Sequence, residues 1–135
     1  MQKSFILAKK RNGKYCREKG NNYERKIAKE LNELGFDVVT SRSESKNTDN
    51  NKVDLIDKSN KLPLNIQLKK VLKTPNYFTI RSESTVDPIT FCIIWAKQES
   101  GEKNMKTVGE VAIIDKRMLY QLLKPYGDGK GDSDV

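Results

Sequence analysis

The sequence predicts a single α/β domain in which helices flank a mixed β-sheet. The chain has 135 residues, a length that fits one compact domain rather than two separately stable ones. A helical pattern near the start is followed by three strand patterns, an undecided connection, two more strand patterns and a last helical pattern. Helices and strands in this order are typical of an α/β domain built on a mixed sheet.

The first half of the chain carries one predicted helix and three predicted strands. In residues 22–34, apolar residues recur at spacings of four, four and three, which places them on one helical face, and Gly35 supplies the stop. Residues 36–42 are β-branched and predict a strand, and residues 53–57 predict a second short one. Residues 62–71 alternate apolar and polar side chains, which is the period of a strand.

The second half is predicted to complete the sheet and end in a helix. Residues 77–81 fit either a short strand or the entry to a helix, and their pattern does not separate the two. Residues 89–97 form an apolar run of the kind that is buried on both faces of a sheet. Residues 99–107 predict a polar loop, residues 108–114 a strand, and Asp115 the cap of the last helix. One face of that helix carries Met118, Leu119, Leu122 and Leu123.

The composition excludes several classes of enzyme. Histidine is absent, so the chain cannot be a Ser-His-Asp or Cys-His hydrolase, a His-bearing zinc protein or a nuclease with a His-bound metal. Its two cysteines, Cys16 and Cys92, have no C-x-x-C motif around them and predict free thiols in a reducing cytosol. The chain has neither a transmembrane stretch nor the order of segments of a secretory signal, so we expect a cytoplasmic protein with no membrane partner.

The net charge of +8 is concentrated at the amino end. Residues 1–20 carry seven basic residues and one acid. Such an arm suits binding to a phosphate backbone, although surface lysines often serve only solubility. We divide the chain into a basic extension (1–16), a domain (17–124) and a disordered acidic and Gly-rich tail (125–135). The arm residues expected to bind DNA are Lys9, Lys10, Arg11, Lys14, Arg17 and Lys19.

A candidate metal site is predicted where the second and third strands meet. If residues 53–57 and 62–71 form an antiparallel hairpin, Asp54 lies across from Gln67, and Lys69 follows on the same face as Gln67. Carboxylate and amide oxygens with a nearby ammonium group suit Mg²⁺ and a phosphodiester. The alternative is that all three are ordinary outward polar residues of a half-exposed hairpin.

The order of motifs resembles a known nuclease superfamily. K-G-N-N-Y-E-R, G-F-D-V-V-T-S-R-S, V-D-L-I and L-P-L-N-I-Q-L-K-K occur in that order between residues 19 and 70. They resemble the PD-(D/E)XK superfamily, and within it most closely the archaeal-type Holliday-junction resolvases. From residue 89 onward only the order of elements matches. The resemblance implies a restriction-endonuclease-like αβββαβ core with a mixed central sheet flanked by helices.

The resemblance also implies roles for individual residues. Glu24 falls on the glutamate of the first helix, Asp54 on the metal-binding aspartate and Lys69 on the lysine of the E-x-K element. Gln67 stands where that element has its glutamate, and an amide brings an oxygen ligand without a negative charge. Natural variation, a degenerate site and an engineered knock-out all remain open for Gln67. The implied metal ligands are Asp54, Gln67 and Glu24, and the implied catalytic set adds Lys69.

Several of these residues have structural alternatives. Glu24 lies three residues after Asn21 and would also fit a capping box. Arg42 and Ser43 match the R-S region of the family, where they would contact a DNA phosphate, or else they only solvate a loop. The strand aromatics are better explained as core than as platforms for base stacking. These aromatics are Phe36, Phe78, Phe91 and Trp95.

The sequence thus predicts a metal-dependent, structure-selective endodeoxyribonuclease that cuts four-way junctions with Mg²⁺ or Mn²⁺. Two symmetric cuts require two active sites, so we expect a homodimer. One alternative is a DNA-binding protein that keeps the nuclease fold but has weak or no activity because of Gln67. The other is a nicking or flap nuclease of the same superfamily. A phage that processes branched DNA in the cytoplasm of its host is a source that would suit this function.

Overall fold

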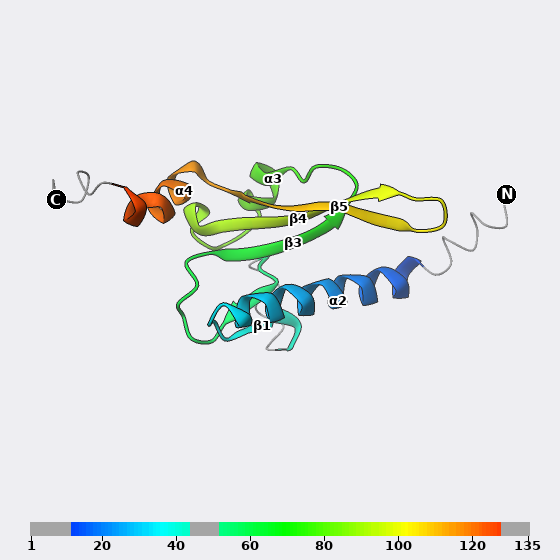
Figure 1. Ribbon diagram of the computed structural model, residues 1–135, viewed down its shortest axis with the longest axis horizontal. Coiled ribbons are helices and arrows are strands. Elements are labelled where there is room, and N and C mark those ends of the chain that lie inside the picture. Colours follow the sequence, from blue (N-terminus) through cyan, green and yellow to red (C-terminus); the bar gives the residue numbers. More distant parts are fainter. Residues whose placement is uncertain (1–11, 44–51, 128–135) are drawn as a thin grey trace.

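A mixed sheet forms the centre of the molecule, as predicted, but it has three strands, because the first two predicted strands pair in a separate sheet (Figure 1). The computed structural model describes residues 12–43 and 52–127. The middle strand of the sheet is parallel to one neighbour and antiparallel to the other. In order across the sheet, the strands are β3 (Asn65–Val71), β4 (Phe91–Ser100) and β5 (Met105–Ile114). The α/β fold class predicted from the sequence is therefore confirmed.

Helix α2 (Asn12–Glu33) covers one face of this sheet (Figure 1). It begins well before the predicted start at residue 22, because the K-G-N-N-Y segment continues the helix instead of capping it. Asn21 is therefore an interior residue, and the capping-box interpretation of Glu24 is wrong. The predicted stop is confirmed at Gly35, whose φ of 109° lies in the left-handed region that favours glycine.

The core has two parts, one on each face of the sheet. On the α2 side, the buried residues include Tyr23, Ile27, Ile66 and Cys92. Cys92 is a buried free thiol, as predicted. On the other face, Tyr77 of helix α3 (Tyr77–Ser82) packs with Phe91 and Ile93. Successive side chains of β4 therefore enter different halves of the core, which confirms the prediction of a strand buried on both faces.

The predicted hairpin between the second and third strands is wrong. Strand β2 (Leu55–Asp57) pairs antiparallel with β1 (Val38–Thr40) in a separate two-stranded sheet. The reason is Asp57, whose carboxylate accepts hydrogen bonds from the backbone N–H groups of Ser59, Lys61 and Leu62. These bonds wrap the chain around the Asp57 side chain in a wide turn, which replaces the tight turn that a hairpin requires.

Two further expectations need correction, and one question that the sequence left open is answered. Residues 99–107 are mostly strand, because β4 and β5 form a long hairpin closed by a bond from Gly101 N to Asn104 O at 2.8 Å. A Cβ at Gly101 would lie 2.5 Å from that oxygen, so the turn requires glycine. Phe78 is 70% exposed and is not a core residue. Residues 77–81, undecided from the sequence, are helical.

The carboxyl end of the described chain is the helix α4 (Lys116–Leu123) followed by the short turn η4 (Lys124–Tyr126). The predicted cap is confirmed, since the Asp115 side chain accepts a hydrogen bond from the backbone N–H of Arg117. Only Met118 of the predicted apolar face is buried. The predicted tail starts at residue 125, within η4, and its residues 128–135 lie outside the described part. Among the described helices, none is long and apolar enough to span a bilayer.

Candidate functional site

Asp54 is fixed at the free edge of β3 by three hydrogen bonds. Its backbone N–H donates to Ile66 O at 2.9 Å, and its carbonyl accepts from Ser41 N at 2.8 Å. Its carboxylate Oδ2 accepts from Leu68 N at 2.7 Å. Leu68 N belongs to the peptide bond that follows Gln67, so the Asp54 carboxylate lies beside the backbone of Gln67. This happens although β2 and β3 are not paired among the described strands. The predicted neighbourhood of Asp54 and Gln67 is present with a different backbone geometry.

Burial raises the pKa of Asp54 to about 6. This value already includes the effects of neighbouring groups: the Leu68 N–H group and the positive charges of Lys69 and Arg42 lower the pKa, and the negative charge of Glu24 raises it. These charges act on Asp54 only because their side chains are close to it. The fold therefore brings together Glu24, Asp54 and Lys69 from three segments that are far apart in the sequence.

Glu24 and Arg42 form an ion pair beside Asp54. Arg42 Nε lies 3.1 Å from Glu24 Oε1, and a second guanidinium nitrogen lies 3.5 Å from Oε2. Glu24 is 6% exposed, so its charge needs this partner. Arg42 lies in the short helix η1 (Ser41–Ser43) and is half-exposed. Its guanidinium therefore contacts both the buried carboxylate and solvent.

Gln67 and Lys69 lie on one face of β3, opposite Ile93 and Trp95 of the parallel neighbour β4. Gln67 Oε1 is buried and accepts no hydrogen bond within the described part of the structure. A buried amide oxygen without a donor costs about 1–3 kcal/mol. Such a cost persists at functional sites where a bound group supplies the missing partner.

The donors at this edge fit a hard divalent cation. Asp54 supplies a carboxylate, and Gln67 supplies an amide oxygen that lacks a partner among the described residues. The carbonyl of Leu68 points to the same edge as its N–H, because both groups of one residue in an extended strand share a direction. No cluster of three or more Asp, Glu, Cys or His side chains occurs in the described residues, and Glu24 is paired with Arg42. The fit depends on one carboxylate and neutral oxygens.

A polar cavity of about 290 Å³ adjoins Glu24 and Arg42. Asn21, Arg25 and Thr40 complete its lining, and Asn21 Oδ1 is a second buried oxygen without a partner among the described residues. None of these three residues is among the site residues predicted from the sequence. Two of them could have been found from their spacing to Glu24. Asn21 stands three residues before Glu24 and therefore shares its helical face, and Arg25 follows Glu24 directly and borders that face.

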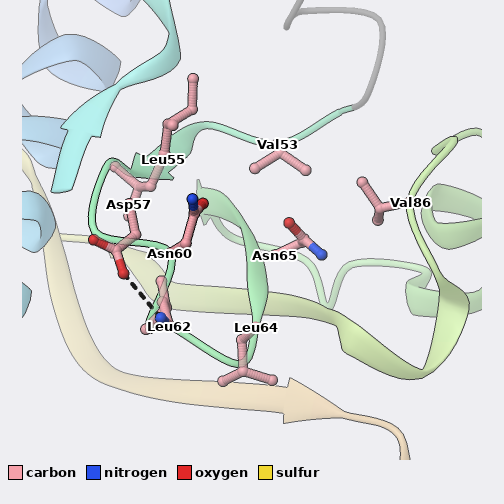
Figure 2. A pocket seen from close by; sticks show the side chains of 9 residues that line it. Val53, Leu55, Asp57, Asn60, Leu62, Leu64, Asn65 and Val86 are labelled. Carbon is pink, nitrogen blue, oxygen red and sulfur yellow. Dashed lines mark hydrogen bonds between the residues drawn. The ribbon is translucent and has the colours of Figure 1, made fainter. Parts of the chain in front are cut away.

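A larger cavity of about 330 Å³ is lined by Val53 and Leu55, the chain neighbours of Asp54, but by none of the candidate catalytic residues. Figure 2 shows its lining of mainly apolar residues, with Asn65 and Val86 facing it from one side. The Asp57 carboxylate is the charged group there, and it is occupied by hydrogen bonds such as the one from Leu62 N drawn in Figure 2. With its carboxylate engaged in this way, the cavity offers no available acid or base for catalysis.

The predicted DNA-binding residues fall mostly outside the part of the chain whose side chains are described. Lys9, Lys10 and Arg11 lie outside the described residues altogether. Lys14, Arg17 and Lys19 lie in the first turns of α2, and there the structure describes only the backbone. Ser43 ends η1, and its side chain is likewise not described. Of the predicted DNA-binding set, Arg42 alone has a described side chain.

Comparison with known families identifies a matching family model. The family model described as "Archaeal holliday junction resolvase (hjc)" matches residues 15–107, which is more than half of the chain. The matched range includes most of α2, all three residues of the Asp54, Gln67 and Lys69 set, and most of the central sheet. No curated protein and no solved structure gives a significant match.

Proposed function

Because the chain belongs to the archaeal Holliday junction resolvase family of the PD-(D/E)XK superfamily, we propose that it is a metal-dependent, structure-selective DNA endonuclease. Its substrate would be the phosphodiester bonds at a four-way junction. The single observation that carries this proposal is the hydrogen bond from Leu68 N to the Asp54 carboxylate at 2.7 Å. That bond holds the aspartate against the strand segment that bears Gln67 and Lys69.

Asp54 and Gln67 would hold Mg²⁺ or Mn²⁺, and Glu24, whose charge acts on Asp54, would bind the ion through water. When bound, the ion supplies charge that lowers the pKa of water and polarises a phosphoryl oxygen. One support is the Gln67 side-chain oxygen, which has no hydrogen-bond donor among the described residues. Another is the raised pKa of Asp54, because it means that the positive charges nearby do not compensate for the burial of this carboxylate. A carboxylate whose pKa is about 6 is also mostly ionised at neutral pH, as a ligand must be.

Lys69 would contact the phosphate at which the strand is cut. Its ammonium group would orient the attacking water and stabilise the negative charge that develops on the phosphoryl oxygens. Glu24 would accept a hydrogen bond from that water, because each carboxylate oxygen can accept more than the one bond from Arg42. Arg42 then has a positioning role as well as the DNA contact predicted from the sequence.

DNA binding would depend on backbone phosphates rather than base edges. The arm residues, Arg42 and Ser43 are the predicted contacts, and Arg25 joins them because it lines the cavity beside Arg42. Two opposed strands must be cut to resolve a junction, so a two-fold symmetric homodimer with one site per subunit is the arrangement we propose.

The test is cleavage of strand-labelled DNA by wild type, Asp54→Asn and Lys69→Ala in Mg²⁺ and in Mn²⁺. A four-way junction, a flap, a nicked duplex and an intact duplex of the same sequence serve as substrates. We expect wild type to cut the junction symmetrically, and both variants to lose at least roughly a hundredfold in rate. Leu34→Ala is the matched control, since Leu34 is 74% exposed just after the end of α2, away from the β3 edge. Equal cutting of all four substrates would exclude a resolvase, whereas faster cutting of the flap or the nicked duplex than of the junction would favour a nicking or flap nuclease.

A second candidate is a junction-binding protein that keeps the nuclease fold without catalysis. The observation that favours it is Gln67, because an amide brings no negative charge to the metal site. Among the described residues at the β3 edge, Asp54 is then the one carboxylate that is not already in an ion pair, since Glu24 pairs with Arg42. This candidate predicts tight junction binding, no cleavage in either metal, and no activity recovered by Gln67→Glu. Measurable symmetric cleavage by the wild-type chain would exclude it.

A further inference from the structure

The segment that carries Gln67 and Lys69 of the candidate site has only basic charged residues. Residues 58–82 contain six basic residues and no acidic residue. The segment includes all of β3, the turn that follows it, and α3. Together with the amino-terminal arm, this stretch more than accounts for the net charge of +8, so the rest of the chain is net acidic. Its charge complements a DNA backbone. The six residues are Lys58, Lys61, Lys69, Lys70, Lys73 and Arg81.

Two apolar side chains are exposed in the middle of this basic segment. Val71 ends β3 and is 37% exposed, and Leu72 follows it and is 46% exposed. They stand between Lys70 and Lys73 in the sequence L-K-K-V-L-K. Exposed apolar residues are common on protein surfaces, so exposure alone would not single these two out. What distinguishes them is that they are adjacent and have a lysine on each side, so this surface would present an apolar contact framed by positive charge to a DNA partner.

The backbone beneath these side chains is held in place by β4. Trp95 Nε1 donates to Val71 O at 2.9 Å, and Lys97 Nζ donates to Leu72 O at 2.5 Å. Two long side chains of the neighbouring strand therefore fix successive carbonyls of the turn. The result is a turn with a fixed main chain and exposed apolar side chains, which is the form of a contact surface that loses little entropy on binding.

We propose that Val71 and Leu72 form an apolar tip that packs against bases exposed at the branch point of the DNA. This inference rests on the proposed nuclease function and deepens it, because it identifies residues that distinguish a branched substrate from a duplex. Leu72 lies three residues beyond Lys69, which corresponds to roughly 10 Å along an extended chain. That span matches about three base steps, so the tip would reach the branch point when Lys69 contacts a phosphate a few nucleotides away.

The energetic basis of the selectivity is the cost of unstacking. Apolar side chains that insert between base pairs of an intact duplex must first break stacking, which costs a few kcal/mol per step. At a branch point the continuous stack is already interrupted, so the same contact is made at lower cost. The adjacent Lys73 would remain near a phosphate. A second copy of the chain is a poorer occupant of this surface, because a symmetric contact would bring the lysines of both tips together.

The experiment uses the full-length chain and a four-way junction with 2-aminopurine at the branch point, in buffer that contains EDTA so that no cutting occurs. We expect wild type to bind and to raise the fluorescence as the base unstacks. Leu72→Ala should bind within about threefold of wild type but lose at least about half of the fluorescence rise, and it should cut the junction roughly 5- to 10-fold more slowly in Mg²⁺. Leu72→Phe should restore both signals, and Leu34→Ala should leave both unchanged.

Three outcomes would overturn the inference. The first is a Leu72→Ala chain with the fluorescence and cutting rate of wild type. The second is a change in sedimentation from dimer to monomer in Leu72→Ala, because the tip would then be a subunit contact. In the third, wild type fails to bind the junction, and this outcome alone also overturns the proposed function. A urea unfolding midpoint equal to that of wild type verifies that the Leu72→Ala chain is folded.

Discussion

Replacing Asp54 by asparagine is expected to stabilise the protein at neutral pH while it abolishes DNA cleavage. The carboxylate is partly buried, and its pKa is raised from an ordinary value of 3.8 to about 6. Between these two values the folded state holds the proton and the unfolded state has released it. The folded state therefore loses stability as the pH rises through this window.

The size of the effect follows from the pKa values. A difference of about two units, at about 1.36 kcal/mol per unit, corresponds to about 3 kcal/mol. This contribution to wild-type stability is fully present below pH 3.8 and is lost above about pH 6. The amide that replaces the carboxylate in Asp54→Asn would still accept the hydrogen bond from Leu68 N but would not titrate, so the variant lacks this pH dependence.

The assay is urea unfolding of both proteins without divalent metal at several values of pH from about 3.5 to 8. The unfolding free energy of Asp54→Asn minus that of wild type should grow by about 3 kcal/mol between the lowest pH and pH 7. Other titrating groups are present in both proteins and cancel in this difference. A difference that stays constant within about 0.5 kcal/mol over this range would refute the reasoning, since it would mean that Asp54 has an ordinary pKa in the folded state.

Three further substitutions test neighbouring contacts. Gln67→Glu adds a negative charge beside Asp54 and should lower the Mg²⁺ concentration for half-maximal binding by about tenfold, as measured by calorimetry. Arg42→Ala removes the partner of the buried Glu24 carboxylate and should cost about 1–2 kcal/mol in urea unfolding, a figure reduced for the solvent exposure of the guanidinium. Tyr23→Phe removes the hydrogen bond from the Tyr23 hydroxyl to Glu110 at 2.7 Å and should cost about 1 kcal/mol with an unchanged m-value.

Matched controls make these results specific. Gln67→Asn shortens the side chain without adding charge and should weaken metal binding, so a gain of affinity in both Gln67 variants would contradict the charge argument. Arg42→Lys keeps the positive charge and should recover about half of the lost stability. Loss of stability larger than about 3 kcal/mol in Tyr23→Phe would mean that the ring is displaced as well as the hydroxyl.

The periodic parts of the fold were predictable from the sequence. The alternation around Ile66, the apolar run around Ile93 and the cap at Asp115 all occur where their patterns place them. These features depend on neighbours within the same element, so a local pattern is enough to predict them. The start of α2 at Asn12 was missed because the polar first turns carry no apolar stripe, and a polar segment gives no period to detect.

The sequence nominates residues for the candidate site but does not give its geometry. Strand register selected Asp54, Gln67 and Lys69, and the order of motifs added Glu24; their functional roles remain predictions. The expected hairpin was wrong because it assumed that the strand after Asp54 pairs with the next strand along the chain. The Asp57 carboxylate binds the backbone of the connecting turn instead, and β2 pairs with β1.

By itself, then, the sequence determined the α/β class, the excess of positive charge, the absence of imidazole chemistry and the set of residues at the β3 edge. The tertiary structure alone decided that Arg42 pairs with Glu24, that Gln67 Oε1 is buried without a donor among the described residues, and that the pKa of Asp54 is raised to about 6. The physical reason is that composition and periodicity are properties of the chain, whereas burial and charge pairing depend on segments brought together through space.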